Sequence, residues 1–368
     1  MEEKIIEKPS LAVIILNWNG WRQTIACLES LYQSTHTNFI ALVVDNGSSD
    51  DSVKKIQSWA AGDLAAQLNL FTYTSENKPI PIEFVSAGQA LTDKAGLPPA
   101  AQSLILIENN ENTGFARGNN IGIKFLLQYE NIKNFFLLNN DTEIAPTCLE
   151  KLIRAAELEK KAAAFQPKML SMQDPAFIDA AGISIDNTYG GASQYGCGEK
   201  DGETFSRAFE IFGVSGGAAF LRREMLADIG LFDEDFFAYY EDVDLALRAQ
   251  LRGWKSLFVP GAVVYHAHSS TLGRESPLKI FLCERNRYYY TIKDMPFPLV
   301  RRFLLNRPRY IIGTILRYLL DKNFTAAKYF LKGNLAPLVN ITRVLQKRKK
   351  LRSRQTVPEK NLRAKFKQ

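Results

Sequence analysis

Short polar side chains follow four apolar runs of the sequence, each at the point where the run ends. They are Asn17-Trp18-Asn19-Gly20, Asp45, Glu108-Asn109-Asn110 and Asn139-Asn140-Asp141. Asn and Asp favour turns, so one such end on its own predicts a turn. If the runs are parallel strands, all four ends lie at the sheet edge where open α/β proteins bind ligands. We therefore interpret the four ends together as a site.

The residue types indicate a nucleotide and a metal ion at this edge. A carboxylate such as Asp141, with a distant histidine, suits Mg²⁺ or Mn²⁺, which usually keep substrate phosphates among their ligands. Asp45 is instead suited to accept hydrogen bonds from a nucleobase. The sequence has no GxGxxG after a strand and no GxxxxGK[ST], so the dinucleotide and P-loop modes are not supported. We expect a nucleoside diphosphate across the sheet edge, with a metal on its phosphates.

A second polar cluster lies in the segment FFAYYEDVD, residues 236–244. Its four aromatic residues run directly into Glu241 and Asp242, where a helix is expected to begin. Acidic residues favour helix starts, and Asp244 can pair with Arg248 one turn later, so we assign Asp244 that structural role. Aromatic rings suit the faces of a sugar, and a carboxylate beside them could take a proton from a hydroxyl group.

Strands and helices are expected to alternate in the segments that position these residues. Continuous apolar runs such as LAVIIL (11–16) and FIALVV (39–44) are typical of strands buried on both faces. The alternation predicts an α/β fold with a parallel sheet and right-handed crossovers. Further strands are expected at residues 104–107, 135–138, 178–185 and 212–221, and helices at 24–32, 53–59, 114–129, 146–158 and 240–251.

The expected domain limits follow this pattern. A short N-terminal tail (1–9) precedes the α/β domain (10–277), which is followed by a helical extension interrupted by prolines (278–346) and a basic, disordered tail (347–368). Residues 71–102 contain KPIPIEF and Pro98-Pro99 and are longer than a usual connection. They are expected to form a surface insertion, in the form of a small hairpin.

Composition restricts the class of protein. Apolar content of 46% and charged content of 23% are those of an ordinary soluble protein. The first residues do not form a signal peptide, and no uncharged apolar run reaches the ~20 residues that span a bilayer. Four scattered cysteines without CxxC spacing argue against a zinc site or a disulfide framework. The net charge of +7 comes from residues 341–368, which carry eleven Lys or Arg and one Glu.

Seven segments, in order along the chain, resemble the motifs of family 2 glycosyltransferases, and particularly the rhamnosyltransferase-like enzymes that build bacterial surface polysaccharides. The resemblance covers about residues 10 to 290. It implies a GT-A fold, with a mostly parallel Rossmann-like sheet, and inverting transfer of a sugar from a nucleotide-diphosphate sugar. The segments are VIILNWNG (13–20), VVDNGSSD (43–50), NTGFARGNN (112–120), FLLNNDTEI (136–144), SGGAAFLRRE (215–224), GLFDEDFFAYYEDVDLALRAQLRGW (230–254) and VYHAHSS (264–270).

The resemblance also implies a role for each matching residue. Glu241 and Asp242 are implied as the catalytic pair, with Asp242 as the general base. Asp141 closes the DxD-type metal motif, and His266 is implied as a further ligand of the metal or the diphosphate. Asn139 replaces the first carboxylate, which should weaken the binding of Mg²⁺ or Mn²⁺ or leave Asp141 and His266 as the main ligands. The remaining matched residues are implied to bind the nucleotide sugar: Asn17, Asn19, Asp45, Asn112, Gly114, Arg117, Asn120 and Asn140.

The predicted function is an inverting glycosyltransferase of cell-surface polysaccharide synthesis. dTDP-rhamnose is one candidate donor, and the acceptor is a glycan or a polyprenyl-diphosphate-linked sugar. Galactofuranosyl, glucosyl and N-acetylglucosaminyl transfer by the same fold stay open. So does a nucleotide-sugar-binding protein without catalysis, although a mere binder needs no base such as Asp242.

The basic C-terminal tail allows two further interpretations. A nucleic-acid-binding protein would rest on this tail alone, and we predict no nucleic-acid partner. Stretches at 308–320 and 326–345 mix apolar residues with Lys and Arg, and the run KRKKLRSR (347–354) follows. These features predict binding to an anionic membrane surface through the basic tail, in a cytoplasmic protein held at the inner face of the cell membrane.

Overall fold

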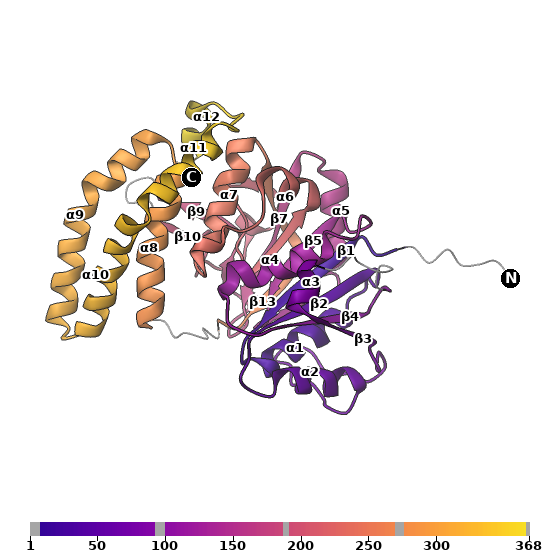
Figure 1. Cartoon of the computed structure of the whole chain (residues 1–368). Helices are drawn as coiled ribbons and strands as arrows, with labels where there is room; N and C mark the ends of the chain where they lie inside the picture. Colours follow the sequence, from indigo (N-terminus) through magenta and orange to yellow (C-terminus); the bar gives the residue numbers. More distant parts are fainter. Residues whose placement is uncertain (1–7, 93–99, 187–190, 269–275, 366–368) are drawn as a thin grey trace.

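A large mixed sheet forms the centre of the computed structural model, which describes residues 8–92, 100–186, 191–268 and 276–365 (Figure 1). Its strands are β1 (Leu11–Asn17), β2 (Phe39–Asn46), β3 (Ile82–Ser86), β4 (Leu104–Asn109), β5 (Asn134–Asn139), β6 (Thr142–Ile144), β7 (Ala162–Ser171), β8 (Ile178–Ala180), β11 (Phe209–Ile211), β12 (Ala218–Arg222) and β13 (Lys255–His266). The main strand order is β11-β13-β7-β12-β5-β1-β2-β4-β3. Strands β9 (Ile183–Ile185) and β10 (Ala192–Gln194) pair separately.

The predicted parallel sheet is confirmed for β1 to β5. β1 pairs in parallel with β2 on one side and with β5 on the other, so the strand order reverses at β1. Asn17 lies in register with Asp45, and Leu16 with Asn139. The polar ends of three strands therefore lie side by side at a reversal of strand order, which is the usual ligand position in open α/β sheets.

Helices cover both faces of this sheet. Val13 and Ile15 of β1 point to one face and pack with α1, α2 and α5, whereas Ala12 and Ile14 point to the other and pack with α4 and α7. This alternation follows from the pleat, and both sets are fully buried. The helices are α1 (Trp21–Tyr32), α2 (Ser52–Ala61), α3 (Ala87–Thr92), α4 (Gly114–Leu126), α5 (Cys148–Leu158), α6 (Arg223–Ile229), α7 (Glu241–Arg252), α8 (Pro277–Asp294), α9 (Phe297–Leu320), α10 (Phe324–Val339), α11 (Ile341–Arg352) and α12 (Glu359–Lys365).

Three sequence-based predictions in the α/β domain are wrong. The strand expected over 212–221 begins only at Ala218, as β12. The expected strand over 178–185 is split into β8 and β9, because Gly182 adopts a φ of +133° that breaks the strand. The expected hairpin within residues 71–102 is absent from the part of this segment that the structure describes. Instead, β3 extends the main sheet in parallel with β4, and α3 follows it.

The C-terminal extension is helical, as predicted, but neither the prolines nor the basic tail behave as expected. Helix α9 continues through Pro308, and α10 contains Pro337. In the tail, α11 continues to Arg352 and α12 follows, so disorder over 347–368 is wrong for the residues described. Lys347 explains part of this order, because its Nζ lies 2.5 Å from Asp233 Oδ1 and 2.6 Å from Asp235 Oδ2.

Candidate active site

The first polar strand end is a buried hydrogen-bond network between the loops after β1 and β2. Asn17 Nδ2 donates to Asp45 Oδ2 over 2.7 Å, and Thr24 Oγ1 donates to Asn17 Oδ1 over 2.7 Å. Asp45 also accepts from the backbone N–H and the hydroxyl of Ser48, at 3.0 and 2.7 Å. Asn19 joins the same loops, because its Oδ1 accepts from Ser49 N over 2.8 Å. The structure thus brings Asn17, Asn19 and Asp45 together, as predicted, and joins the loops that follow β1 and β2 by hydrogen bonds.

A neighbouring network centres on Asn46, which the sequence analysis missed. Asn46 is 1% exposed, and its Nδ2 donates to Asn112 Oδ1 over 3.1 Å. Its Oδ1 accepts from the hydroxyl of Thr113 and from Asn109 Nδ2, at 2.9 and 3.1 Å. Asn46 therefore fixes the loop before α4, which carries the predicted residues Asn112 and Gly114. Its position directly after Asp45 is the only sequence signal for this role.

Gly114 is the point where the loop before α4 meets the segment 236–240. Its φ is +80°, and a β-carbon there would lie 2.4 Å from the carbonyl oxygen of Phe237. The backbone N–H of Ala116 donates to that same oxygen over 3.0 Å. Only glycine permits both the backbone conformation and the close approach. The loop expected to bind the nucleotide and the aromatic segment 236–240 are therefore joined directly.

Three other predicted nucleotide-binding residues make different contacts. Asn120 is buried; its Nδ2 donates to Phe232 O over 2.9 Å and its Oδ1 accepts from Phe232 N over 3.1 Å, so it holds the loop after α6. Arg117 is half exposed, with its Nε 3.9 Å from Glu234 Oε2. Asn140 Nδ2 donates to Thr24 Oγ1 over 3.1 Å and lies against the Gly20 turn.

The end of β5 meets the end of β13, where Asp141 and His266 come together. Thr142 of β6 pairs with His266 of β13 in antiparallel register, and the backbone N–H of Ala267 donates to Asp141 O over 2.9 Å. These contacts place His266 Nε2 3.2 Å from Asp141 Oδ1. The two side chains are 125 positions apart in the sequence and are only slightly exposed. The predicted pair therefore occupies one site.

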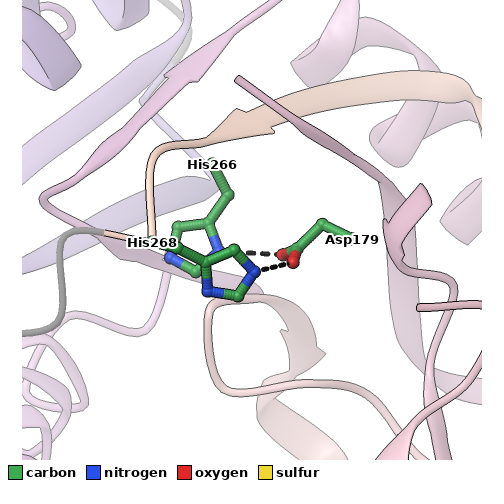
Figure 2. A group of neighbouring side chains, drawn as sticks. All are labelled: Asp179, His266 and His268. Atoms are coloured by element: carbon green, nitrogen blue, oxygen red, sulfur yellow. Dashed lines mark hydrogen bonds and ion pairs between the residues drawn. The ribbon is translucent and has the colours of Figure 1, made fainter. Parts of the chain in front are cut away.

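Asp179 of β8 completes this cluster and was not predicted (Figure 2). The Nδ1–H of His266 donates to Asp179 Oδ2 over 2.8 Å, and His268 Nε2 contacts the other carboxylate oxygen. Asp179 is only 4% exposed. Nothing in the surrounding sequence, FIDAAG, marks this aspartate as different from any other.

The charges of this cluster set the protonation of its members. Burial by itself lowers the pKa of His266, but the hydrogen bonds and negative charges of Asp141 and Asp179 outweigh it and raise that pKa to about 10. Burial raises the pKa of Asp179, but His266 and His268 outweigh burial and lower it to about 2. Without a metal ion, His266 is therefore a cation held between two carboxylates.

The donor set of this cluster fits a divalent cation. Carboxylate oxygen and imidazole nitrogen are ligands that Mg²⁺ and especially Mn²⁺ accept. Asp141 and His266 Nε2 face each other, and Asp179 occupies the other ring nitrogen of His266. That arrangement matches the carboxylate–histidine–metal pattern, in which the outer carboxylate fixes the tautomer and orientation of the ring. Asp179, His266 and His268 offer a second set of ligand atoms, which all lie within 4.8 Å of one another.

Asp242 lies at the start of α7, beside the turn between β11 and β12. Its Oδ2 accepts from the backbone N–H of Gly216 over 2.9 Å, and its Oδ1 accepts from the N–H of Val243 over 2.8 Å. Burial raises the pKa of Asp242, and these two N–H donors partly offset that rise. A β-carbon at the adjacent Gly217 would lie 3.6 Å from Asn139 Nδ2, so the turn brings Asp242 towards the end of β5.

Glu241 differs from Asp242 in its surroundings. It is 6% exposed, and its Oε2 has no hydrogen-bond partner among the described residues. Burial and the neighbouring charge of Asp242 raise the pKa of Glu241 well above its usual range. Of the two, Asp242 is the better able to hold a negative charge, because its carboxylate has two N–H donors whereas Glu241 Oε2 has none among the described residues. Of the predicted pair, only Asp242 is suited to act as a base.

The aromatic loop before this helix is strained and is held from one side by α8. Phe237, Tyr239 and Tyr240 have φ values of 64°, 70° and 69°, which side chains other than glycine rarely adopt. Asn286 of α8 is fully buried, and its Nδ2 lies 2.8 to 2.9 Å from the carbonyl oxygens of residues 236, 238 and 239. Strain of this kind persists only where surrounding contacts over-determine it, and it is common at functional sites.

Comparisons with known proteins agree with this architecture. The model of glycosyl transferase family group 2 matches residues 135–344, which is more than half of the chain. A curated relative from Mycobacterium tuberculosis, an N-acetylglucosaminyl-diphospho-decaprenol L-rhamnosyltransferase, is 35% identical over 77 residues, or 21% of this chain. The matched part spans 25% of the length of that relative.

Solved structures resemble the chain at the level of the fold. The structure of GalNAc-T7 with UDP, GalNAc and Mn²⁺ superposes with a TM-score of 0.57 at 14% identity, covering 92% of this chain and 58% of that one. A mannosyltransferase from Pyrobaculum calidifontis, solved with GDP-Man and Mn²⁺, gives a TM-score of 0.49 at 14% identity, covering 90% and 76%. The predicted GT-A fold is confirmed.

Proposed function

This chain belongs to glycosyl transferase family group 2, and we propose that it transfers a sugar from a nucleotide-diphosphate sugar to a hydroxyl group of an acceptor glycan, with inversion at the anomeric carbon. The observation that carries the proposal is the position of Asp242. Its carboxylate is held by the backbone N–H groups of Gly216 and Val243. The adjoining Gly217 accepts a hydrogen bond from the backbone N–H of Asn139, at the strand end that precedes Asp141. A protein that only binds a nucleotide sugar has no need for such a fixed carboxylate.

The reaction follows from this geometry. Asp242 takes the proton of the acceptor hydroxyl, and the freed oxygen attacks the anomeric carbon of the donor. The bond from that carbon to the diphosphate oxygen breaks, and the nucleoside diphosphate leaves with the electron pair. Attack from the face opposite the leaving group inverts the configuration. The hydrogen bonds from Gly216 and Val243 aim the carboxylate of Asp242, so that little reorganisation is needed during the transfer.

Asp141 and His266 would hold the divalent cation, Mg²⁺ or Mn²⁺, and Asp179 would orient His266. The cation supplies Lewis-acid stabilisation of the departing diphosphate. The networks around Asn17, Asp45 and Asn46 would hold the nucleoside end of the donor, because they fix the loops at the reversal of strand order.

We propose an L-rhamnosyl donor such as dTDP-rhamnose and a polyprenyl-diphosphate-linked acceptor. Both rest on the resemblance of the motifs and on the name of the partial Mycobacterium tuberculosis relative. An acceptor of this kind resides in a membrane, so the enzyme is proposed to act at the cytoplasmic membrane face as a peripheral protein. In the part of the chain that the structure describes, no helix is long and apolar enough to cross a membrane.

A matched pair of variants tests the proposed base. Asp242→Asn removes the base and should lower transfer to a polyprenyl-diphosphate-linked N-acetylglucosamine acceptor by about 10²- to 10⁴-fold, while donor binding stays close to that of the wild type. Glu241→Gln replaces the neighbouring carboxyl group with an amide of the same shape and should keep most of the activity. Near wild-type turnover by Asp242→Asn would refute this mechanism.

A further inference from the structure

Helix α9 carries an apolar stripe on the face that points away from the rest of the molecule. The helix packs inward through Val300, Phe303 and Arg307. Its opposite face presents side chains at intervals of seven, four and four residues, a spacing that keeps them on one side of a helix. These are Leu305, Ile312, Leu316 and Leu320, with exposed fractions of 73%, 59%, 55% and 82%.

Helix α10 has the same organisation. It packs on α8 through buried residues such as Ala326, Phe330 and Pro337. Large apolar side chains lie exposed on its other side, at Phe324, Leu331, Leu335 and Leu338. The two helices form a hairpin at the outer edge of the molecule, beside α8 (Figure 1). Large contiguous patches of exposed apolar surface are unusual on monomeric proteins and mark interaction sites.

The surroundings of these stripes are positively charged. A hollow of about 300 Å³ on α9 is lined by Arg309, Tyr310, Gly313, Thr314 and Arg317. Residues 297–340 contain eight Lys or Arg and one acidic residue, Asp321. Of these cations, Arg307 is buried against Glu284, whereas the others are exposed. An apolar helix face bordered by cations matches the surface of an anionic bilayer, where the stripe enters the acyl boundary and the cations meet phosphate groups.

The basic tail is less suited to this role than the sequence suggests. Besides the ion pairs of Lys347, Arg348 donates to the carbonyl oxygens of Ile292 and Met295, both over 2.7 Å. Arg352 donates to Asp294 O over 2.7 Å. These cations are engaged within the molecule and hold α11 against α8.

We propose that the exposed apolar faces of α9 and α10, with the arginines beside them, dock on an anionic membrane surface. This inference deepens the proposed peripheral association by naming the surface that makes it. Helix α8 packs with α10 and also holds the loop before Asp242 through Asn286, so the docked hairpin and the active site form one unit. The docking itself requires neither donor nor metal.

Vesicle binding by the full chain tests this proposal separately from catalysis. Wild-type protein should sediment with vesicles that contain phosphatidylglycerol and much less with phosphatidylcholine vesicles. The triple variant Leu305→Gln, Ile312→Gln, Leu316→Gln changes only exposed side chains and should weaken binding by about a hundredfold. The variant Arg309→Gln, Arg317→Gln should weaken binding to the anionic vesicles by about tenfold and reduce its salt dependence.

Two control variants locate the surface. Leu158→Gln changes a leucine of α5 that is 72% exposed, outside the hairpin, and Lys349→Gln, Lys350→Gln removes two exposed cations of the tail. Both should bind vesicles like the wild type. Wild-type binding by the triple variant, or no vesicle binding by the folded wild type, would overturn the proposal. The proposal would also be overturned if the wild type formed a dimer in solution, bound no vesicles, and was made monomeric by the triple variant. The apolar faces of α9 and α10 would then form the interface with a second copy of the chain.

Discussion

Replacing Asp179 with Asn tests how the metal site is built. Asp179 does not face Asp141; it accepts the Nδ1–H of His266 over 2.8 Å and thereby leaves Nε2 directed at Asp141. An asparagine keeps the shape but removes the charge that fixes the ring. Loss of such an outer carboxylate weakens metal binding by about 10- to 100-fold, or about 1.4 to 2.8 kcal/mol. We expect a change of that size in the Mn²⁺ dissociation constant of Asp179→Asn.

The measurement is a titration in which the electron paramagnetic resonance signal of free Mn²⁺ is followed. A second readout is the pKa of His266, which should fall from about 10 when one of its two carboxylate neighbours becomes neutral. Wild-type Mn²⁺ affinity in Asp179→Asn would refute the reasoning.

Two further variants distinguish the two possible sets of ligands. If Asp141 and His266 bind the metal, Asp141→Asn should weaken Mn²⁺ binding strongly. His268→Gln should then have a small effect, because His268 is half exposed and contacts the outer carboxylate and the ring of His266. If His268→Gln is the more damaging of the two, the metal lies among Asp179, His266 and His268 instead.

Three other outcomes follow from contacts in the site. Because a metal must displace the proton of His266, whose pKa in the metal-free protein is about 10, Mn²⁺ affinity should rise by up to about tenfold per pH unit from about pH 6 to 8; a plateau above pH 7 would contradict this. Asn286→Ala removes the donor shared by three loop carbonyl groups and should lower the free energy of unfolding by about 1 to 3 kcal/mol in urea titrations, with a matching loss of transfer. Gly114→Ala places a β-carbon against Phe237 O, so its activity should fall even where the protein remains folded; unchanged kinetics would show that the two loops are not coupled there.

The sequence identified the strands whose apolar residues are contiguous and missed those interrupted by proline. LAVIIL and FIALVV correspond to β1 and β2, which are buried on both faces. The long neighbouring strands β7 and β13 contain Pro167 and Pro260, which usually end a strand. The structure accommodates both prolines at one shift in the register between β7 and β13. The shift lies between Val259, which pairs with Pro167, and Val263. This compensation requires both strands at once, so neither segment reveals it alone.

A similar limit applies to the functional groups. Asn17, Asp45, Asn139 and Asp141 were found because each ends a strand of one parallel sheet, so local sequence implies that they share an edge. Asp179 reaches the same place through the antiparallel pairing of β8 with β7, a tertiary contact without a local signal.

The tail shows the same limit for charge. Its high density of Lys and Arg predicts disorder when the carboxylates that pair with these cations are not known. The carboxylates that order it, Asp233 and Asp235, precede it by more than 100 residues. The i,i+4 pair of Asp244 with Arg248, by contrast, is local, and the structure confirms it with a distance of 2.8 Å.

The most direct test of the central claim is the thermal unfolding of the full chain with a panel of nucleotide-diphosphate sugars, with and without Mn²⁺. At about 100 times its dissociation constant, a bound donor adds about 2.7 kcal/mol to the free energy of unfolding. We predict that at least one donor raises the Tm by several degrees with Mn²⁺, and that Asp141→Asn abolishes the metal-dependent part of this shift. If no nucleotide sugar stabilises the folded protein in the presence of Mn²⁺, the polar ends of these strands do not form a donor site, and the account is wrong.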